Sequence, residues 1–290
     1  MPEIVYLNGE FVPPDQAVIP INDRGFLFGD SVYEVVRSYR GRLFALDRHL
    51  ARLARSLREV DMGRPDVEEI RSATEEAFAR SGFPDALVYI QITRGAAPRR
   101  HAYPSDLRPT VLVHVRDAGP LFHKNMYDGV AVITAPDTRW RRCDIKSTNL
   151  LPNILARTKA QNQGAYEAIL VDEQGYVTEA TSASVLCVEK GLLVTRPAGP
   201  EILPSITREV VIELAQEAGI PVREEPVAVD RLKKAEEVFL AGTGDEICPV
   251  IALDGAPIGG GEPGAVTKRL LSAFLARVGA VDPSEERPGT

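Results

Sequence analysis

The first 115 or so residues alternate between short apolar-polar runs, which are typical of strands, and two longer runs at helical spacing. The strand-like runs turn back at the Asn-Gly pair of residues 8–9 and at the Arg-Gly pair of residues 40–41, which predicts two hairpins. Apolar residues recur every three or four positions behind Asp47, a candidate helix cap, and again in a helix expected to end at Gly82. Strands and helices therefore mix within this block.

Residues 119–128 lose this periodicity, and strand and helix patterns restart after them. We therefore expect an α+β fold with two domains. The small N-terminal domain covers 1–118 and the larger C-terminal domain covers 129–281, with 119–128 as the linker. The polar tail at 282–290 is expected to be disordered.

Composition narrows the class of protein. A net charge of -7 and a pI near 5.3 argue against a nucleic-acid partner, which requires a concentrated basic face. The three cysteines stand far apart without metal-ligand spacing, so we expect neither disulfides nor a metal site. No apolar run reaches spanning length and the N-terminus lacks a signal-peptide pattern. The expectation is a cytoplasmic protein that has no membrane partner.

The stretch RWRRCDIKSTNLLPN, residues 139–153, contains a candidate nucleophile. Of 34 basic residues only seven are lysine, and one of them is Lys146 in this arginine-rich stretch. A lysine can lose its proton and attack a carbonyl as a free amine, which an arginine cannot do. A surface lysine is the alternative that this stretch alone leaves open.

Several longer segments, in one order along the chain, resemble a known family. DRGFLFGDSVYEVV, YIQITRGAAPRRHAYP, RWRRCDIKSTNLL, YEAILVDEQGYVTEATSAS, ITREVV and EVFLAGTGDEICPV are similar to fold-type IV pyridoxal-phosphate enzymes, and within them to D-amino acid aminotransferases. The resemblance spans nearly the whole chain. It implies the two-domain fold-type IV architecture, pyridoxal 5'-phosphate as cofactor, and a homodimer.

The resemblance also assigns roles to residues around the cofactor. It makes Lys146 the Schiff-base lysine and the proton shuttle, and it places Glu179 on the pyridine nitrogen, where a carboxylate keeps the ring protonated. The phosphate residues it implies are Arg52, Ile206, Thr207 and Thr243, and the residue supporting the ring is Leu203. Taken without the resemblance, a solvated helix face, a helix cap, a turn and core packing explain these positions equally well.

Tyr33, Arg99 and His101 match the positions at which D-amino acid aminotransferases bind the substrate carboxylate. Arginine suits a planar carboxylate because its hydrogen bonds are charge-assisted. The implied reaction is ping-pong transamination of D-alanine or D-glutamate with pyruvate or 2-oxoglutarate. The chain departs from the family at ATSAS, with Ala183 and Ser184 in a run that is usually more polar, and at Gly244, where a hydroxyl residue is common.

Other functions stay open at this point. A branched-chain L-amino acid aminotransferase shares the fold, the lysine and the glutamate but does not need the Arg99/His101 pair. An (R)-amine transaminase and an aminodeoxychorismate lyase, which eliminates pyruvate, use the same cofactor. A non-catalytic binding module has no need for Lys146, Glu179 and the phosphate residues together.

Overall fold

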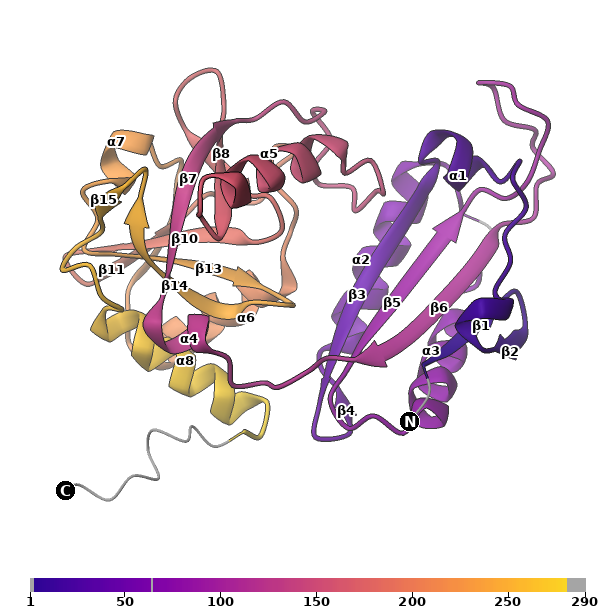
Figure 1. The fold of residues 1–290 in the computed structure, drawn as a ribbon, viewed down its shortest axis with the longest axis horizontal. Helices are drawn as coiled ribbons and strands as arrows, with labels where there is room; N and C mark the ends of the chain where they lie inside the picture. Colours follow the sequence, from indigo (N-terminus) through magenta and orange to yellow (C-terminus); the bar gives the residue numbers. More distant parts are fainter. Residues whose placement is uncertain (1–2, 64, 281–290) are drawn as a thin grey trace. The chain divides into compact units, whose positions relative to one another are not determined.

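The structure, a computed structural model, describes residues 3–63 and 65–280 (Figure 1). The chain divides into two compact units. Unit 1 comprises the chain up to Leu121 together with Ile145–Asn149, and unit 2 comprises Phe122–Asp144 and the chain from Leu150 on.

Unit 1 is a six-stranded antiparallel sheet in the order β2-β1-β6-β5-β3-β4. Helices α2 and α3 pack against one face of it through an aliphatic core. Its elements are β1 (Ile4–Leu7), β2 (Glu10–Val12), α1 (Arg24–Phe28), β3 (Ser31–Tyr39), β4 (Arg42–Leu43), α2 (Leu46–Glu59), α3 (Val67–Ser81), β5 (Ala86–Thr93) and β6 (Thr110–Asp117). Both predicted hairpins are confirmed, as β1–β2 and β3–β4.

Strand β3 presents different side chains to its two faces because successive residues alternate. Val32 and Val36 enter the core shared with α2, and Glu34 lies between them on the same face. Tyr33 lies on the opposite face, where its ring is 5.6 Å from that of Tyr89. One strand thus carries an acid toward the helices and a phenol away from them.

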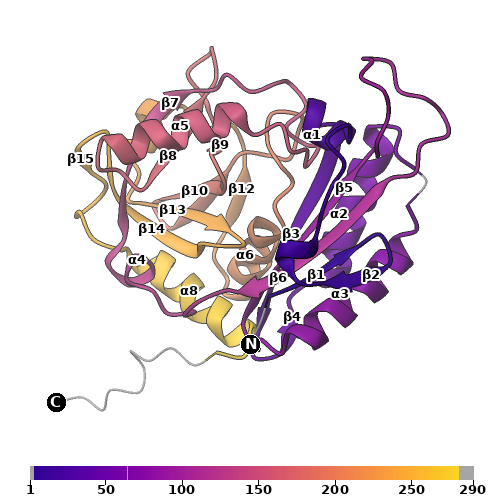
Figure 2. The ribbon, with the colours of Figure 1, turned by 45° about the vertical axis from the view of Figure 1, so that its right-hand side comes forward.

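Unit 2 is a mixed sheet in the order β12-β11-β10-β13-β14-β7-β8-β9, with β15 paired to β14. Helices α6 and α8 lie side by side against β13 and β14, and α5 packs on β7 and β8 (Figure 2). Its elements are α4 (Lys124–Asp128), β7 (Val130–Pro136), α5 (Leu151–Asn162), β8 (Glu167–Val171), β9 (Val177–Ala180), β10 (Ser184–Glu189), β11 (Leu192–Thr195), α6 (Ile206–Glu217), β12 (Val222–Glu224), α7 (Val229–Leu232), β13 (Glu237–Gly242), β14 (Glu246–Leu253), β15 (Ala256–Pro257) and α8 (Ala265–Arg277).

Three predictions of local structure require correction. Asp47 does not cap α2, because the helix begins at Leu46 with Ala45 as its N-cap in a left-handed conformation. The segment predicted as an irregular linker contains the short helix α4, whose Met126 is buried. Residues 145–149, predicted in the C-terminal domain, group with unit 1. The predicted tail at 282–290 lies outside the described residues.

Two short elements escaped the periodicity analysis. Helix α1 has five residues, too few to show a helical repeat, and its ends are defined by the Asp23 side chain, which accepts from the Gly25 amide, and by left-handed Gly29. Strand β9 is buried at all four positions and so shows no alternation. Within residues 3–63 and 65–280, no helix combines the length and apolar character that a membrane crossing requires.

Candidate active site

Lys146 is held against strand β3 by its backbone. Its carbonyl accepts from the Tyr33 amide at 2.9 Å, and its own amide donates to the Ser56 hydroxyl at 3.2 Å. The next residue, Ser147, forms a β-bridge with Val32. The Nζ atom lies 4.3 Å from the centre of the Tyr33 ring, and the residue is only partly buried. A half-buried lysine that is fixed at its backbone can serve as a nucleophile when its amine is neutral.

Glu34 lies on the face of β3 that packs against α2 and binds two side chains of that helix. Its carboxylate accepts from Arg52, at 2.7 Å from Nε and 2.8 Å from Nη2, and it lies 2.8 Å from Nδ1 of His49. Glu34 is completely buried, and Arg52 and His49 nearly so. The bidentate pair engages the Nε–Nη2 edge of the guanidinium and fixes its plane. Arg52, the predicted phosphate residue, is therefore oriented by Glu34.

The protonation states within this cluster follow from burial and charge. Burial alone would raise the pKa of Glu34, but the Arg52 guanidinium and the bond with His49 lower that pKa to about 2. Burial, together with the positive charges of Arg52 and Lys146, lowers the pKa of His49 below its ordinary value, although the Glu34 carboxylate acts to raise it. The imidazole is therefore mainly neutral at pH 7, and its proton sits on Nδ1, where it is donated to Glu34.

In unit 2, Glu179 on β9 is fixed from two sides. Arg139 Nη1 donates to Oε1 of Glu179, and the Leu203 amide donates to both carboxylate oxygens at 3.2 Å. Arg139 is held in turn by Asp137, with Nε at 2.9 Å from Oδ1 and Nη2 at 2.7 Å from Oδ2. Burial would raise the pKa of Asp137, but Arg139 and Thr178 lower it, so Asp137 stays ionised and keeps the guanidinium in place.

The predicted phosphate residues of unit 2 are at the start of α6 and after β13. Ser205 caps α6 by accepting from the Arg208 amide at 3.2 Å. The amides of Ile206 and Thr207, in the first turn, have no acceptor within the helix. With the helix dipole they form a favourable position for an anion. Thr243 is half-buried in the turn between β13 and β14.

Arg99 and His101 lie in the long loop between β5 and β6, which extends past the end of the sheet (Figure 1). Both side chains are exposed. They contact Phe28 of α1, with the Arg99 guanidinium carbon 5.2 Å and the His101 ring centre 5.9 Å from the Phe28 ring centre. No hydrogen bond, ion pair or ring contact among the described residues joins either of them to Tyr33. Tyr33 lies beside Lys146, and the two loop residues lie beside Phe28.

The candidate residues are divided between the units. Unit 1 holds Tyr33, Arg52, Arg99, His101 and Lys146, and unit 2 holds Glu179, Leu203, Ile206, Thr207 and Thr243. Sequence reasoning missed three partners of these residues: Glu34, His49 as a polar partner, and Arg139. An acid between Val32 and Val36 on a core-facing row was the signal for Glu34, because a buried carboxylate needs a partner.

The departures from the family pattern have simple structural settings. A Cβ atom added at Gly244 would meet no atom within 4 Å, so no close neighbour requires glycine there. Ser184 begins β10 and is buried, and its hydroxyl has no hydrogen-bond partner among the described residues. The same residues contain no group of three His, Cys, Asp or Glu side chains that could hold a metal ion.

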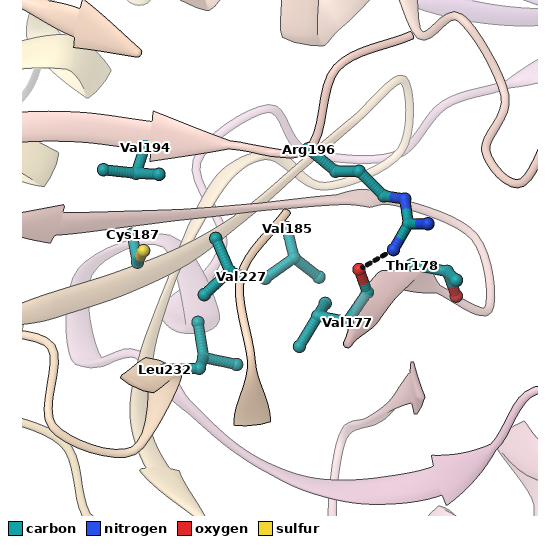
Figure 3. Close-up of a pocket in the computed structure, with 8 residues that line it drawn as sticks. All are labelled: Val177, Thr178, Val185, Cys187, Val194, Arg196, Val227 and Leu232. Carbon is teal, nitrogen blue, oxygen red and sulfur yellow. Dashed lines mark hydrogen bonds between the residues drawn. The ribbon is translucent and has the colours of Figure 1, made fainter. Parts of the chain in front are cut away.

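Figure 3 shows a pocket inside unit 2 that is a packing feature. It is bordered mainly by aliphatic side chains, and Arg196 closes one side by donating to the Val177 carbonyl at 2.9 Å. Its lining consists of Val177, Thr178, Val185, Cys187, Val194, Arg196, Val227 and Leu232. No candidate site residue borders it, so it carries no part of the predicted chemistry.

The sequence of this chain is similar to those of known aminotransferases. Residues 31–253 match the family described as amino-transferase class IV. The chain is 42% identical over 271 residues to a D-alanine aminotransferase of Bacillus licheniformis, covering 93% of this chain and 95% of that protein.

Solved structures are similar over nearly the full length. A branched-chain amino acid aminotransferase of Escherichia coli has a TM-score of 0.90 at 27% identity, over 99% of this chain and 98% of that one. The T.th. branched-chain amino acid aminotransferase with pyridoxamine 5'-phosphate has a TM-score of 0.89 at 28% identity, over 98% and 96% of the two chains. The predicted α+β, fold-type IV architecture is confirmed, and the chain belongs to the class IV aminotransferase family.

Proposed function

We propose that this protein is a pyridoxal-phosphate-dependent transaminase of D-amino acids, of the D-alanine or D-glutamate type, with pyruvate or 2-oxoglutarate as amino acceptors. The observation that carries the proposal is Lys146, a half-buried lysine fixed at its backbone with its amine 4.3 Å from the centre of the Tyr33 ring. The 42% identity to a D-alanine aminotransferase supports the choice of D-amino acids. Branched-chain aminotransferases match this chain at 27–28% identity.

The residues present fit a phosphorylated pyridine aldehyde. Lys146 offers an amine for the aldehyde carbon, and Glu179 offers a carboxylate that Arg139 holds in an ion pair. Arg52 and the first-turn amides of α6, which have no acceptor within the helix, suit the phosphate. When bound, the cofactor supplies an electron sink for the negative charge that develops on the substrate Cα.

The protein's own groups perform the proton transfers and the positioning. Lys146 Nζ would take the proton from the substrate Cα and deliver it to the former aldehyde carbon of the cofactor, a role that only a group able to be neutral can fill. Glu179 would hold a proton at the pyridine nitrogen of the bound cofactor, and Leu203 would support its ring. Arg52, Ile206, Thr207 and Thr243 bind phosphate. Tyr33 of one subunit would bind the substrate carboxylate together with Arg99 and His101 of the partner subunit. This would select the hand of the substrate, because Lys146 acts on one face of the ring only.

Replacing Arg99 by alanine is expected to lower kcat/KM for D-alanine roughly ten- to a hundredfold, since a charge-assisted hydrogen bond contributes about 1.5 to 3 kcal/mol. Turnover of (R)-1-phenylethylamine, which has no carboxylate, should persist or improve. Both rates are measured in coupled assays on the same preparations. If Arg99→Ala leaves D-alanine turnover unchanged, or the wild type prefers L-leucine to every D-amino acid, the branched-chain alternative takes its place.

The proposal includes a homodimer, and exposed apolar side chains support it. Leu151, Ile154 and Leu155 are 65%, 56% and 62% exposed and lie three and four residues apart on one face of α5. In unit 1, Ile21 and Phe26 are 83% and 76% exposed. Apolar rows of this kind mark surfaces that pack against another protein, and a second copy of this chain is the proposed partner.

We expect the double substitution Ile154→Asp, Leu155→Asp to weaken the dimer, because each change places a charge in an apolar contact. Light scattering should give twice 31.6 kDa for the wild type and a concentration-dependent fall toward 31.6 kDa for the variant. Gln216→Asp, at an exposed polar position of α6, is the control. A fully active wild-type monomer at assay concentration contradicts the dimer.

A cytoplasmic location completes the proposal. All three cysteines, Cys143, Cys187 and Cys248, are free. Burial raises the pKa of Cys187 and of Cys248 to about 12, which keeps these thiols protonated. Free thiols suit the reducing cytoplasm.

A further inference from the structure

Arg24 is a buried arginine outside the predicted active-site residues. Its side chain is only 5% exposed, yet it spans two parts of unit 1. Nε donates to Asp30 Oδ2 at 2.7 Å, Nη1 donates to the carbonyl of Arg100 at 2.6 Å, and Nη2 donates to the carbonyl of His101 at 3.0 Å. The guanidinium thus binds consecutive backbone carbonyls in the loop that carries Arg99 and His101.

The position of Arg24 is itself determined by several bonds. Its amide donates to the Gly95 carbonyl at 2.9 Å, at the base of the same loop. The helix it begins is capped by Asp23, which also accepts from Thr93 Oγ1 at 2.9 Å and from Thr110 Oγ1 at 2.7 Å. Both threonines are on the strands that flank the loop. Arg24 and its neighbour Asp23 are therefore bonded to the residues at which the loop leaves β5 and enters β6, and this fixes the backbone of Arg24 relative to the loop.

The same loop is also held at Tyr103, whose ring centre lies 3.7 Å from the Arg94 guanidinium carbon, and Arg24 is what binds the backbone at residues 100 and 101. Residues 99–101 are exposed, and the ring of Phe28, contacted by Arg24 at 4.9 Å, is what the Arg99 and His101 side chains rest on. A flat guanidinium fixes two carbonyls at once, which a lysine ammonium at the same place cannot reproduce. The bonds of Arg24 therefore fix the backbone from which both loop side chains project.

We infer that Arg24 is a positioning residue for substrate carboxylate binding: it holds the loop so that Arg99 and His101 are preorganised before substrate arrives. This inference rests on the proposed role of these two residues. Arg24 itself touches neither substrate nor cofactor. Its contribution is to remove the ordering that binding would otherwise require.

The test is Arg24→Lys, with Arg24→Gln as a second variant in case the first perturbs folding. KM for D-alanine should rise roughly tenfold with kcat changed much less, whereas the rate with (R)-1-phenylethylamine should stay within about twofold. Hydrogen exchange of amides 96–103, measured without substrate, should become several-fold faster. Arg100→Ala is the matched control, because it removes a loop cation but leaves the carbonyl that Arg24 binds.

A double-mutant cycle separates positioning from a general structural effect. In the Arg99→Ala, His101→Ala background, Arg24→Lys should cost less than about twofold further in kcat/KM for D-alanine, because the residues it positions are gone. Full additivity, equal losses with D-alanine and the amine, or unchanged loop exchange overturns the inference. If Arg99→Ala itself does not affect D-alanine turnover, the proposed carboxylate site fails, and this inference fails with it.

Discussion

Replacing Lys146 by alanine is expected to abolish transamination, lowering kcat by about 10,000-fold or more, the upper range for loss of a general base. The loss is large because one amine both holds the cofactor and transfers the proton at Cα. Cofactor should remain bound only non-covalently, through the phosphate and pyridine contacts. The measurement combines single-turnover kinetics with D-alanine and borohydride reduction followed by peptide mapping.

The control for this substitution is Lys159→Ala. Lys159 is exposed on α5 and has no described hydrogen bond or ion pair. The Lys159→Ala variant should have the absorbance of the wild type, and borohydride should bleach its yellow colour irreversibly, as it does in the wild type. A borohydride-stable label on any lysine other than Lys146 in the wild type contradicts the assignment.

Lys146 could be identified as a candidate nucleophile from the sequence, because the reactivity of an amine belongs to one residue and the surrounding stretch is distinctive. Its position beside β3 could not be predicted from the sequence. Residues 145–149 lie between two segments of unit 2 in the sequence, but they pair with β3 of unit 1, which is more than a hundred residues earlier in the chain. Hydrophobic periodicity reports how one segment faces its surroundings, and it contains no information on which distant strand that segment joins.

The hairpins were predictable for the opposite reason. Asn8 and Arg40 have φ values of 51° and 49°, each followed by a glycine with positive φ, so the turn is determined by neighbouring residues. The cap of α2 was not, since Ala45 has φ 52° without a residue type that favours it. Tertiary packing overrides the local preference there, and Asp47 instead pairs with Arg71 of α3 at 2.8 Å.

The polar partners of the site were beyond sequence analysis because each pairs residues from different elements. Arg139 reaches Glu179 across 40 positions, and Glu34 reaches Arg52 across 18. The sequence does not show which charged residue pairs with which. It does predict that a carboxylate on a buried row of side chains needs a hydrogen-bond donor as its partner.

Replacing Glu34 by glutamine is expected to destabilise unit 1 by about 3 to 5 kcal/mol at pH 7. The substitution keeps the shape of the side chain but leaves the Arg52 guanidinium buried without its counter-charge. Urea unfolding of the cofactor-free protein measures the loss. Circular dichroism should be followed, because the one tryptophan, Trp140, belongs to unit 2.

The pH dependence of this difference follows from the pKa of Glu34, about 2 when folded against an ordinary value of 4.5. A carboxyl with a depressed folded pKa binds more protons when unfolded, so its stabilisation is complete above pH 4.5 and is lost as the pH falls toward 2. The size of this contribution is about 3 kcal/mol. The wild type should therefore lose its advantage over Glu34→Gln progressively between about pH 5 and pH 2.

The informative quantity is the difference in the free energy of unfolding between the wild type and Glu34→Gln. Other carboxyl groups titrate in the same pH range, but both proteins contain them, so their contributions cancel in this difference. Glu69→Gln, at an exposed position of α3, should follow the wild type at every pH. His49 gives an independent readout: in Glu34→Gln its Nδ1 proton faces at best a neutral amide oxygen in place of a carboxylate, so the imidazole signal should shift. A wild-type advantage that stays constant from pH 7 to pH 2 means that Glu34 is not the ionised partner of Arg52.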